Sequence, residues 1–188
     1  RIETDIIRAK VLLKEHLGVT NKLFAYPYGE YNEEVMNILD SLGYVGLAQQ
    51  SGAIGVSFDT LAIPRFPMAT NYFDMKRFAT SVNTKLLPVK NVQIGSKVLQ
   101  VGEIRNHSFS FELMDGNYRE EQLACYASSK GKLPIKVQDK KVQMQLPLWS
   151  SGRKKINCTA PSKTEKGVFY WYSQLWLVKS NDGSWYKE

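Results

Sequence analysis

The spacing of apolar residues changes once along this 188-residue chain, and that change constrains the fold more than any other feature. Residues 1 to about 85 alternate helical and extended patterns. From about Val89 onward the helical period is lost, and short segments of alternating apolar and polar residues follow. We therefore expect two domains, an α/β part in residues 1–87 and an all-β sandwich in residues 88–188.

The first part predicts helices that alternate with short strands. Apolar residues at helical spacing run from Ile2 to Leu17, and Gly18 ends this pattern. Further along, the expected elements are a strand Leu23–Tyr26, a helix capped by Asn32 and ending at Gly43, strands Tyr44–Ala48 and Leu61–Phe66, and a helix Phe73–Ser81. This alternation indicates an α/β sheet, either open or barrel-like.

The second part predicts roughly seven short strands separated by turn signals such as Asp115-Gly116-Asn117. The expected strands are Val92–Val101, His107–Leu113, Gln122–Ser128, Ile135–Val137, Lys141–Leu146, Lys155–Cys158 and Val168–Val178. Strands of this number and spacing are typical of a β-sandwich of about 100 residues.

The two cysteines, Cys125 and Cys158, both fall in the expected sandwich. They do not form a CxxC pair, which argues against a zinc knuckle. Their spacing suits two strands of one sandwich, where they either form a disulfide or remain two buried thiols. Our hypothesis is that they face each other and become bridged in an exported protein.

The segment Phe169–Leu177 is apolar or aromatic on both of its alternating faces. One face is expected to fill the sandwich core, so the other needs a partner. That partner is either the first domain, which we favour, a glycan stacked on Trp176 and Tyr172, or a neighbouring loop.

The chain carries a net charge of +7. Its basic residues are scattered and no nucleic-acid recognition motif accompanies them, so we expect no nucleic-acid partner. No apolar run approaches the roughly 20 residues that cross a bilayer, and we expect no membrane span in this chain.

The stretch Phe24–Asn32 lies where a strand ends and a helix begins. Ligands of α/β sheets bind beyond the carboxyl ends of strands. Pro27 stiffens the turn and Gly29 permits a tight backbone, which could hold a main-chain N–H outward as an oxyanion donor. From these residues alone, an ordinary turn over packed aromatic side chains is the favoured alternative.

These residues, with Gly43-Tyr44 and the segment Ile63–Met68, resemble the end of the catalytic domain of polysaccharide deacetylases, carbohydrate esterase family 4. The resemblance covers about residues 1–85 and extends into a β domain of one branch of that family. It implies a partial, irregular deacetylase barrel. It also implies that the intact enzyme uses a divalent metal, commonly zinc, to remove acetyl groups from N-acetylglucosamine units.

The family holds its metal with one aspartate and two histidines, and a second aspartate is its base. All four lie in earlier motifs that we do not find here. His16 and His107 are isolated and better interpreted as structural, so we expect no metal or other cofactor in this chain. Because the chain opens at Arg1 within a helical pattern, we expect a fragment, inactive without the missing N-terminal part of the catalytic domain.

The resemblance implies that Tyr28 gives a backbone N–H to the oxyanion, and that Tyr26, Pro27 and Tyr28 border the substrate. The family's motif begins with arginine where this chain has Ala25. Arg65 is our candidate to replace that arginine as an electrostatic helper, because arginine does not release its proton. The family's late leucine-x-histidine motif is also missing, which leaves the general acid undefined.

The sequence thus predicts part of an extracytoplasmic polysaccharide N-deacetylase acting on N-acetylglucosamine-containing polysaccharide. One alternative is a module that binds an envelope glycan without catalysis, through aromatic side chains and positive charge. A structural interaction domain is the other.

Overall fold

The computed structural model describes residues 1–56, 58–69, 72 and 74–186. The chain divides into two compact units. Unit 1 comprises Arg1–Ala48 and Asp59–Ile63, and unit 2 comprises Gln49–Phe58 and Pro64–Glu188.

Unit 1 begins with helix α1, Ile2–Leu17, as predicted. Gly18 ends it in the left-handed conformation, with φ of 66°, and its N–H donates to the Lys14 carbonyl at 3.0 Å. Glu3 and Asp5 in the first turn oppose the partial positive charge of the helix N-terminus. Ile6 is the buried residue of α1, and most of its other apolar side chains are exposed.

A strand–helix–strand unit follows. Strand β1, Leu23–Ala25, runs parallel to β2, Val45–Leu47, with Phe24 opposite Gly46. Between them lie the 3-10 turn η1, Pro27–Gly29, and helix α2, Glu33–Ser41. Asn32 caps α2 as predicted, because its side-chain oxygen accepts the Val35 N–H at 3.0 Å.

The predicted strand Leu61–Phe66 is wrong. A single residue, Ile63, forms an isolated parallel bridge with Leu47 on the far side of β2. The Arg65 N–H then donates to the Gln50 carbonyl at 3.0 Å, beyond the end of β2, so one further hydrogen bond forms but no further strand pairing. Pro64 to Phe66 then belong to unit 2.

Helix α3 of unit 2 spans Met75–Asn83, close to the predicted helix, whose first residue Phe73 lies outside the described residues. The side chain of Asp74 caps it by accepting the Lys76 N–H at 3.0 Å. The short strand β3, Lys85–Leu86, comes next and pairs in parallel with β12.

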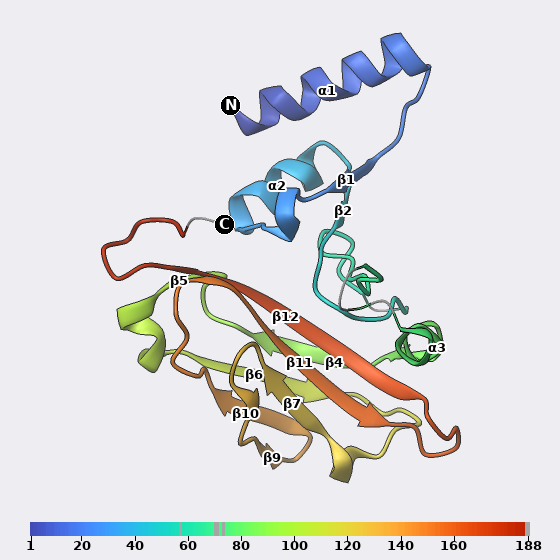
Figure 1. Ribbon diagram of the computed structural model, residues 1–188, viewed down its shortest axis with the longest axis vertical. Helices are drawn as coiled ribbons and strands as arrows, with labels where there is room; N and C mark the ends of the chain where they lie inside the picture. The colour runs from blue at the N-terminus through green and yellow to red at the C-terminus, as the bar shows by residue number, and fades with distance from the viewer. Residues whose placement is uncertain (57, 70–71, 73, 187–188) are drawn as a thin grey trace. The chain divides into compact units, whose positions relative to one another are not determined.

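The rest of unit 2 forms two sheets (Figure 1). One has the order β4-β6-β10-β9 and is antiparallel; the other has the order β3-β12-β11-β7-β8, with β5 also paired to β12. The bounds are β4 Val89–Gln93, β5 Val98–Gln100, η3 Val101–Asn106, β6 Ser108–Leu113, η4 Glu120–Gln122, β7 Ala124–Ala127, β8 Gly131–Lys132, β9 Lys136–Gln138, β10 Lys141–Gln145, β11 Gly152–Pro161 and β12 Phe169–Lys179.

One predicted strand is divided into two in the structure. The segment Val92–Val101 was expected to run as a single strand, but β4 and β5 belong to different sheets. Gly95 lies between them with φ of 65°, a left-handed conformation that turns the chain away from an extended path.

Side chains from both sheets share one core. The ring of Phe109 on β6 lies 5.2 Å from Trp176 and 6.3 Å from Tyr172, both on β12. Trp176 is fully buried, so the suggested glycan stacking on Trp176 and Tyr172 is wrong. Tyr172 is partly buried and packs against the same core.

The opposite face of β12 is covered by loops of the same unit. The ring of Phe66 packs edge-on against Trp171 at 5.3 Å, and the Ser173 hydroxyl donates to the Ser51 carbonyl. Of the three partners considered for this face, the structure thus shows a neighbouring loop, which lies within residues 1–87.

Cys125 and Cys158 form a disulfide between β7 and β11, as hypothesised. The two residues are directly paired across the strands, with their Cα atoms 4.0 Å apart, and both are fully buried. The bond therefore ties two neighbouring strands together on the core side of their sheet.

Over the described residues the fold is mixed α/β, with several sheets, few helices and no closed barrel. The finer arrangement, a partial deacetylase barrel followed by a sandwich with a boundary at Leu87-Pro88, remains a prediction. No helix in the described part of the chain has the length and apolar character needed to cross a membrane.

Candidate functional site

The candidate turn begins where β1 ends. The Tyr26 N–H still pairs with the Leu47 carbonyl of β2 at 3.1 Å. Two tight hydrogen bonds then reverse the chain, from the Gly29 N–H to the Tyr26 carbonyl at 2.9 Å and from the Glu30 N–H to the Pro27 carbonyl at 3.0 Å. Pro27 supplies a fixed φ at the first position of this 3-10 turn.

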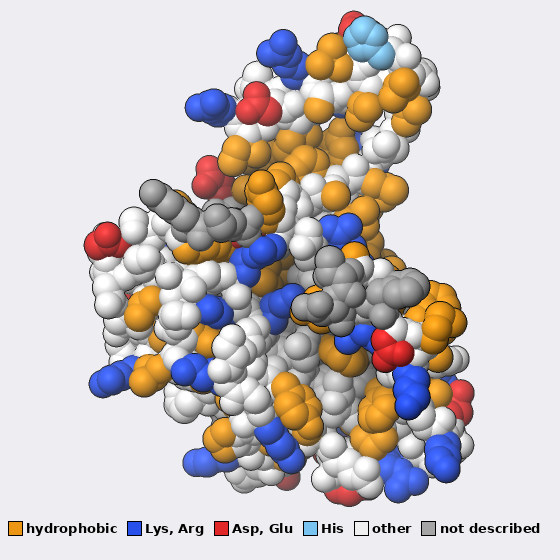
Figure 2. Space-filling model, in the orientation of Figure 1, with side chains coloured by type: hydrophobic (Ala, Val, Ile, Leu, Met, Phe, Trp, Pro, Cys, Tyr) orange, Lys and Arg blue, Asp and Glu red, His pale blue; other side chains and the backbone are white. Residues whose placement is uncertain are grey.

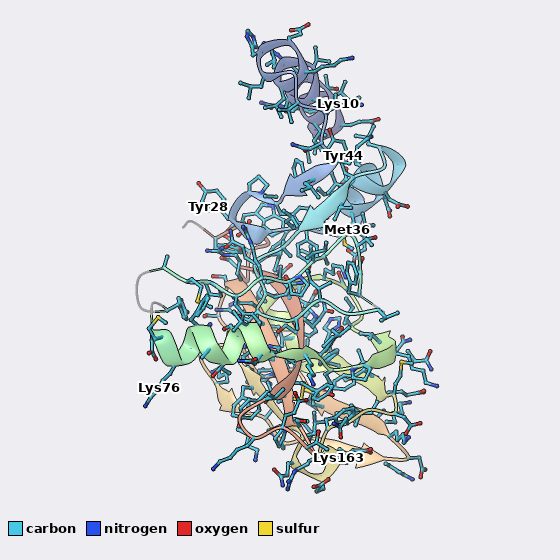
Figure 3. All side chains as sticks on the ribbon, turned by 90° about the vertical axis from the view of Figure 1, so that its right-hand side faces the viewer. Lys10, Tyr28, Met36, Tyr44, Lys76 and Lys163 are labelled. Atoms are coloured by element: carbon cyan, nitrogen blue, oxygen red, sulfur yellow. A yellow bond between two sulfur atoms is a disulfide. The ribbon has the colours of Figure 1, made fainter. Side chains whose placement is uncertain are left out.

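Tyr28 occupies the left-handed region, with φ of 54° and ψ of 7°. A non-glycine residue seldom adopts this conformation, because its Cβ crowds the backbone. The side chain is 65% exposed, and Figure 3 shows it projecting outward from the turn. Sparsely populated backbone conformations cluster at functional sites, so this turn is the candidate site of unit 1.

The ring of Tyr26 supports the turn from below. It is 2% exposed and stacks on the Tyr31 ring at 4.7 Å, while Phe24 packs edge-on at 5.6 Å. Its hydroxyl donates to the Leu61 carbonyl at 2.7 Å. Burial, and secondarily the charge of Asp59, raises the pKa of Tyr26 well above its usual value.

Gly46 on β2 makes room for this arrangement. A Cβ at this position would lie 2.7 Å from the Tyr26 hydroxyl oxygen and closer still to the Leu61 carbonyl oxygen. Because glycine has no Cβ, β2 can approach the Tyr26 side chain this closely at Gly46.

The predicted site residues fall into two groups. Tyr26, Pro27 and Tyr28 are brought together in one turn of unit 1, with the side chains of Pro27 and Tyr28 exposed and that of Tyr26 buried. Arg65 belongs to unit 2, where its side chain is exposed and its N–H donates to the Gln50 carbonyl at 3.0 Å.

The described residues do not fit a catalytic zinc site. Such a site needs three protein ligands, commonly histidine and carboxylate, around one position. His16 lies exposed on α1 of unit 1 and His107 follows η3 in unit 2. No group of three His, Cys, Asp or Glu side chains in the part of the chain that the structure describes could hold a metal ion.

Two features of the turn were missed at the level of sequence. The left-handed Tyr28 has no local signature beyond its place between Pro27 and Gly29, because asparagine or glycine would be the usual residue there. The role of Gly46 depends on a contact with Tyr26, 20 positions away in the chain. It could not be read from the sequence near either residue.

The chain resembles known proteins over part of its length. Residues 1–47 match the family model described as polysaccharide deacetylase. This segment contains the whole Tyr26–Gly29 turn and ends before Arg65. No curated protein matches the chain.

A solved structure, the endo-β-1,4-mannanase from Thermotoga petrophila, matches with a TM-score of 0.36 and 10% identity. The match covers 95% of this chain and 43% of the mannanase chain, so this chain spans less than half of that protein's length. A likeness this distant supports no conclusion about this protein.

Proposed function

We propose that this chain forms part of a metal-dependent polysaccharide N-deacetylase that removes acetyl groups from N-acetylglucosamine-containing glycans. The observation that carries the proposal is the strained, exposed Tyr28 in a turn that lies inside the segment matching the polysaccharide deacetylase family. Strained backbone conformations are found mainly at active sites and ligand-binding sites, and the conformation of Tyr28 is consistent with such a role.

Deacetylation passes through a tetrahedral intermediate whose oxygen carries negative charge. A backbone N–H fixed in advance stabilises that charge without reorganisation during the reaction. In our proposal the Tyr28 N–H is this donor and its exposed ring forms a wall of the sugar groove, together with Pro27. Tyr26, which is buried, contributes by fixing the turn from beneath.

Arg65 is proposed as an electrostatic helper in place of the arginine that the family has at Ala25. The divalent metal, which we expect to be zinc, would be bound by residues other than those described, because these do not fit it. The chain by itself is then expected to be inactive, and the remainder of the catalytic domain is its partner.

The proposed location is extracytoplasmic. The buried disulfide between Cys125 and Cys158 supports it, because disulfides persist in oxidising compartments and are rare in the cytosol.

A second candidate is a module that binds an envelope glycan without catalysis. It is favoured by one observation, the basic character of unit 2, which contains 20 Lys and Arg residues against 10 Asp and Glu.

Acetate release tests the first proposal. The complete gene product, loaded with zinc, should release acetate from a chitooligosaccharide, whereas residues 1–188 alone should release none. If the metal-loaded complete protein leaves every N-acetylglucosamine oligomer acetylated, the proposal fails and the binding module takes its place.

Metal content gives an independent check. After dialysis, elemental analysis of residues 1–188 should find no stoichiometric zinc. Zinc bound at a single site with His16 or His107 among its ligands would contradict the assignment of the metal to other residues.

A further inference from the structure

The charge of the chain is divided unequally between the two units. Unit 1 contains 5 Lys and Arg residues and 8 Asp and Glu, a net charge of −3, whereas unit 2 has a net charge of +10. Figure 2 shows basic side chains spread over the side of unit 2 that carries β11 and β12. A surface of this kind attracts polyanions.

Strand pairing brings a tyrosine and two lysines together on the outer face of the larger sheet. Tyr126 on β7 pairs with Lys132 on β8 and with Asn157 on β11. Directly paired residues project to the same face of a sheet, and so do residues two apart on one strand. Lys155 and Arg153 therefore share this face with Asn157.

This face is opposite the core. Cys125 and Cys158, the neighbours of Tyr126 and Asn157 in sequence, point inward and form the disulfide. We name the outward-pointing group the Tyr126 face and define it by Tyr126, Lys132, Arg153, Lys155 and Asn157.

Tyr126, Lys132 and Arg153 of the Tyr126 face are exposed, whereas Lys155 and Asn157 are half-buried. The Tyr126 ring is 44% exposed, and Lys132 is exposed beside it. Ser128 fixes the backbone of Lys155, since its hydroxyl accepts the Lys155 N–H at 2.9 Å. The Asn157 side-chain oxygen lies 2.6 Å from the Ser173 hydroxyl oxygen and shares its proton with the Ser51 carbonyl. With its oxygen engaged, the amide nitrogen of Asn157 can serve as a donor to a ligand.

The electrostatics of the Tyr126 face favour an anion. Lys132 and Lys155 take part in none of the ion pairs found among the described residues, which are Lys85–Glu165, Lys90–Glu112 and Lys140–Asp115. Burial, and secondarily the neighbouring charge of Arg153, lowers the pKa of Lys155. An anionic group placed beside Lys155 would offset both effects.

We propose that the Tyr126 face binds an acidic polysaccharide, with the Tyr126 ring stacking on a sugar and with Lys132 and Lys155 contacting carboxylates. An exposed aromatic ring flanked by cations suits a ligand that is both ring-shaped and negatively charged. This site is separate from the Tyr28 turn, and it stands whether or not the deacetylase proposal is correct.

The spacing of the two lysines favours a glycan over a nucleic acid. Lys132 and Lys155 lie on β8 and β11, the strands on either side of β7, and Lys155 is two residues along β11 from the residue level with Lys132, so their backbones are about 12 Å apart. That distance is comparable with the length of one disaccharide. Carboxylates recur at this interval in a glycan that carries one acid per disaccharide, whereas successive phosphates of a nucleic acid are closer together.

Calorimetric titration of residues 1–188 with a hyaluronan octasaccharide tests the proposal. Tyr126→Ala, Lys132→Gln and Lys155→Gln should each weaken binding by about threefold to tenfold, the effect expected when one stacking or charge-assisted contact is lost. Binding should also weaken as salt is added.

A double variant, Lys163→Gln with Lys166→Gln, is the matched control. It removes positive charge from the exposed loop between β11 and β12 and should change the affinity by less than about twofold. Circular dichroism and the intact mass of the disulfide-bonded form check that each variant is folded.

Three results would overturn the proposal. If the control weakens binding as much as Lys132→Gln does, the attraction is diffuse and there is no site at Tyr126. If a neutral chitooligosaccharide binds as tightly as hyaluronan, charge is not recognised. If single-stranded DNA binds more tightly than hyaluronan, with the same dependence on Tyr126 and the lysines, the partner is a nucleic acid.

Discussion

The hydroxyl of Tyr26 donates a hydrogen bond to the Leu61 carbonyl at 2.7 Å, and this bond joins the end of β1 to the returning segment Asp59–Ile63 of unit 1. The same ring stacks on Tyr31, beyond the turn that contains Tyr28. The buried tyrosine thus connects both sides of the candidate site, and its environment leads to the first two predictions.

Tyr26→Phe removes the hydroxyl and leaves the Leu61 carbonyl without this donor. We expect unit 1 to lose about 1 kcal/mol of stability, the usual net contribution of one such bond. Hydrogen exchange of the amides in β1 and β2 measures it locally. The control is Tyr44→Phe, at a tyrosine that is also buried but whose hydroxyl has no hydrogen bond within the described residues. Equal effects of the two variants would contradict the assigned role of the Tyr26 hydroxyl.

Gly46→Ala should be more damaging than Tyr26→Phe. The added Cβ would lie 2.7 Å from the Tyr26 hydroxyl oxygen and would press on the Leu61 carbonyl, which is backbone and cannot rotate away. Overpacking of this kind costs about 1–3 kcal/mol. Gly102→Ala is the control, since its Cβ would meet nothing closer than 3.6 Å. Comparable exchange protection in unit 1 for Gly46→Ala and wild type would refute the close approach.

The disulfide should be a main support of unit 2. It links residues 33 positions apart, and a bridge over such a loop stabilises by about 3–4 kcal/mol through the unfolded state. Urea unfolding of the double variant Cys125→Ser with Cys158→Ser, followed by tryptophan fluorescence, should show a loss of this size. Mass spectrometry of protein from its native compartment should find no freely alkylated thiol, and two free thiols there would contradict the bridge.

Tyr118 should make unit 2 sensitive to alkali. It is 2% exposed, its hydroxyl donates to the Met114 carbonyl, and burial raises its pKa to about 12. The unfolded chain releases this proton near pH 10 and the folded chain does not, so stability should fall as the pH rises from about 10 towards 12. Tyr118→Phe should flatten that part of the stability profile measured by urea unfolding. An unchanged slope would show that Tyr118 ionises equally in both states.

Local signals in the sequence predicted the helices of unit 1 well. Gly18 ends α1 and Asn32 caps α2 through interactions with residues three or four positions away, so the information lies in short stretches of sequence. The prediction of a strand at Leu61–Phe66 failed because the apolar residues of this segment pack as a loop, in which Ile63 alone forms a bridge with β2. Burial in a loop and burial in a short strand produce the same apolar pattern.

The faces of β12 could not be assigned from the sequence either. Both faces are aromatic, and the choice between Trp171 and Trp176 for the core depends on the position of Phe109 on β6. The candidate sites share this difficulty. The turn could be predicted from Pro27 and Gly29, which are close in sequence. The Tyr126 face could not, because it forms only when β7, β8 and β11 pair.

In the complete enzyme that we propose, turnover should depend on Arg65. Arg65→Ala should lower it by roughly tenfold to a thousandfold, the range for loss of one fixed electrostatic group near a developing charge. Tyr28→Ala should do less damage, because the backbone donor survives and only the groove wall is removed. Steady-state kinetics on a chitooligosaccharide measures both variants, with circular dichroism to confirm folding.

Tyr28→Gly separates the backbone of this residue from its side chain. Glycine adopts a φ of 54° without the crowding that tyrosine suffers, so the variant should keep the turn and its N–H while losing the ring. We expect its turnover to match that of Tyr28→Ala, with unit 1 more stable than in Tyr28→Ala by up to about 1 kcal/mol. Turnover that is lost completely in both variants would show that the Tyr28 ring, rather than its N–H, is the essential group. Unchanged turnover in a folded Arg65→Ala enzyme would show that Arg65 does not replace the arginine absent at Ala25.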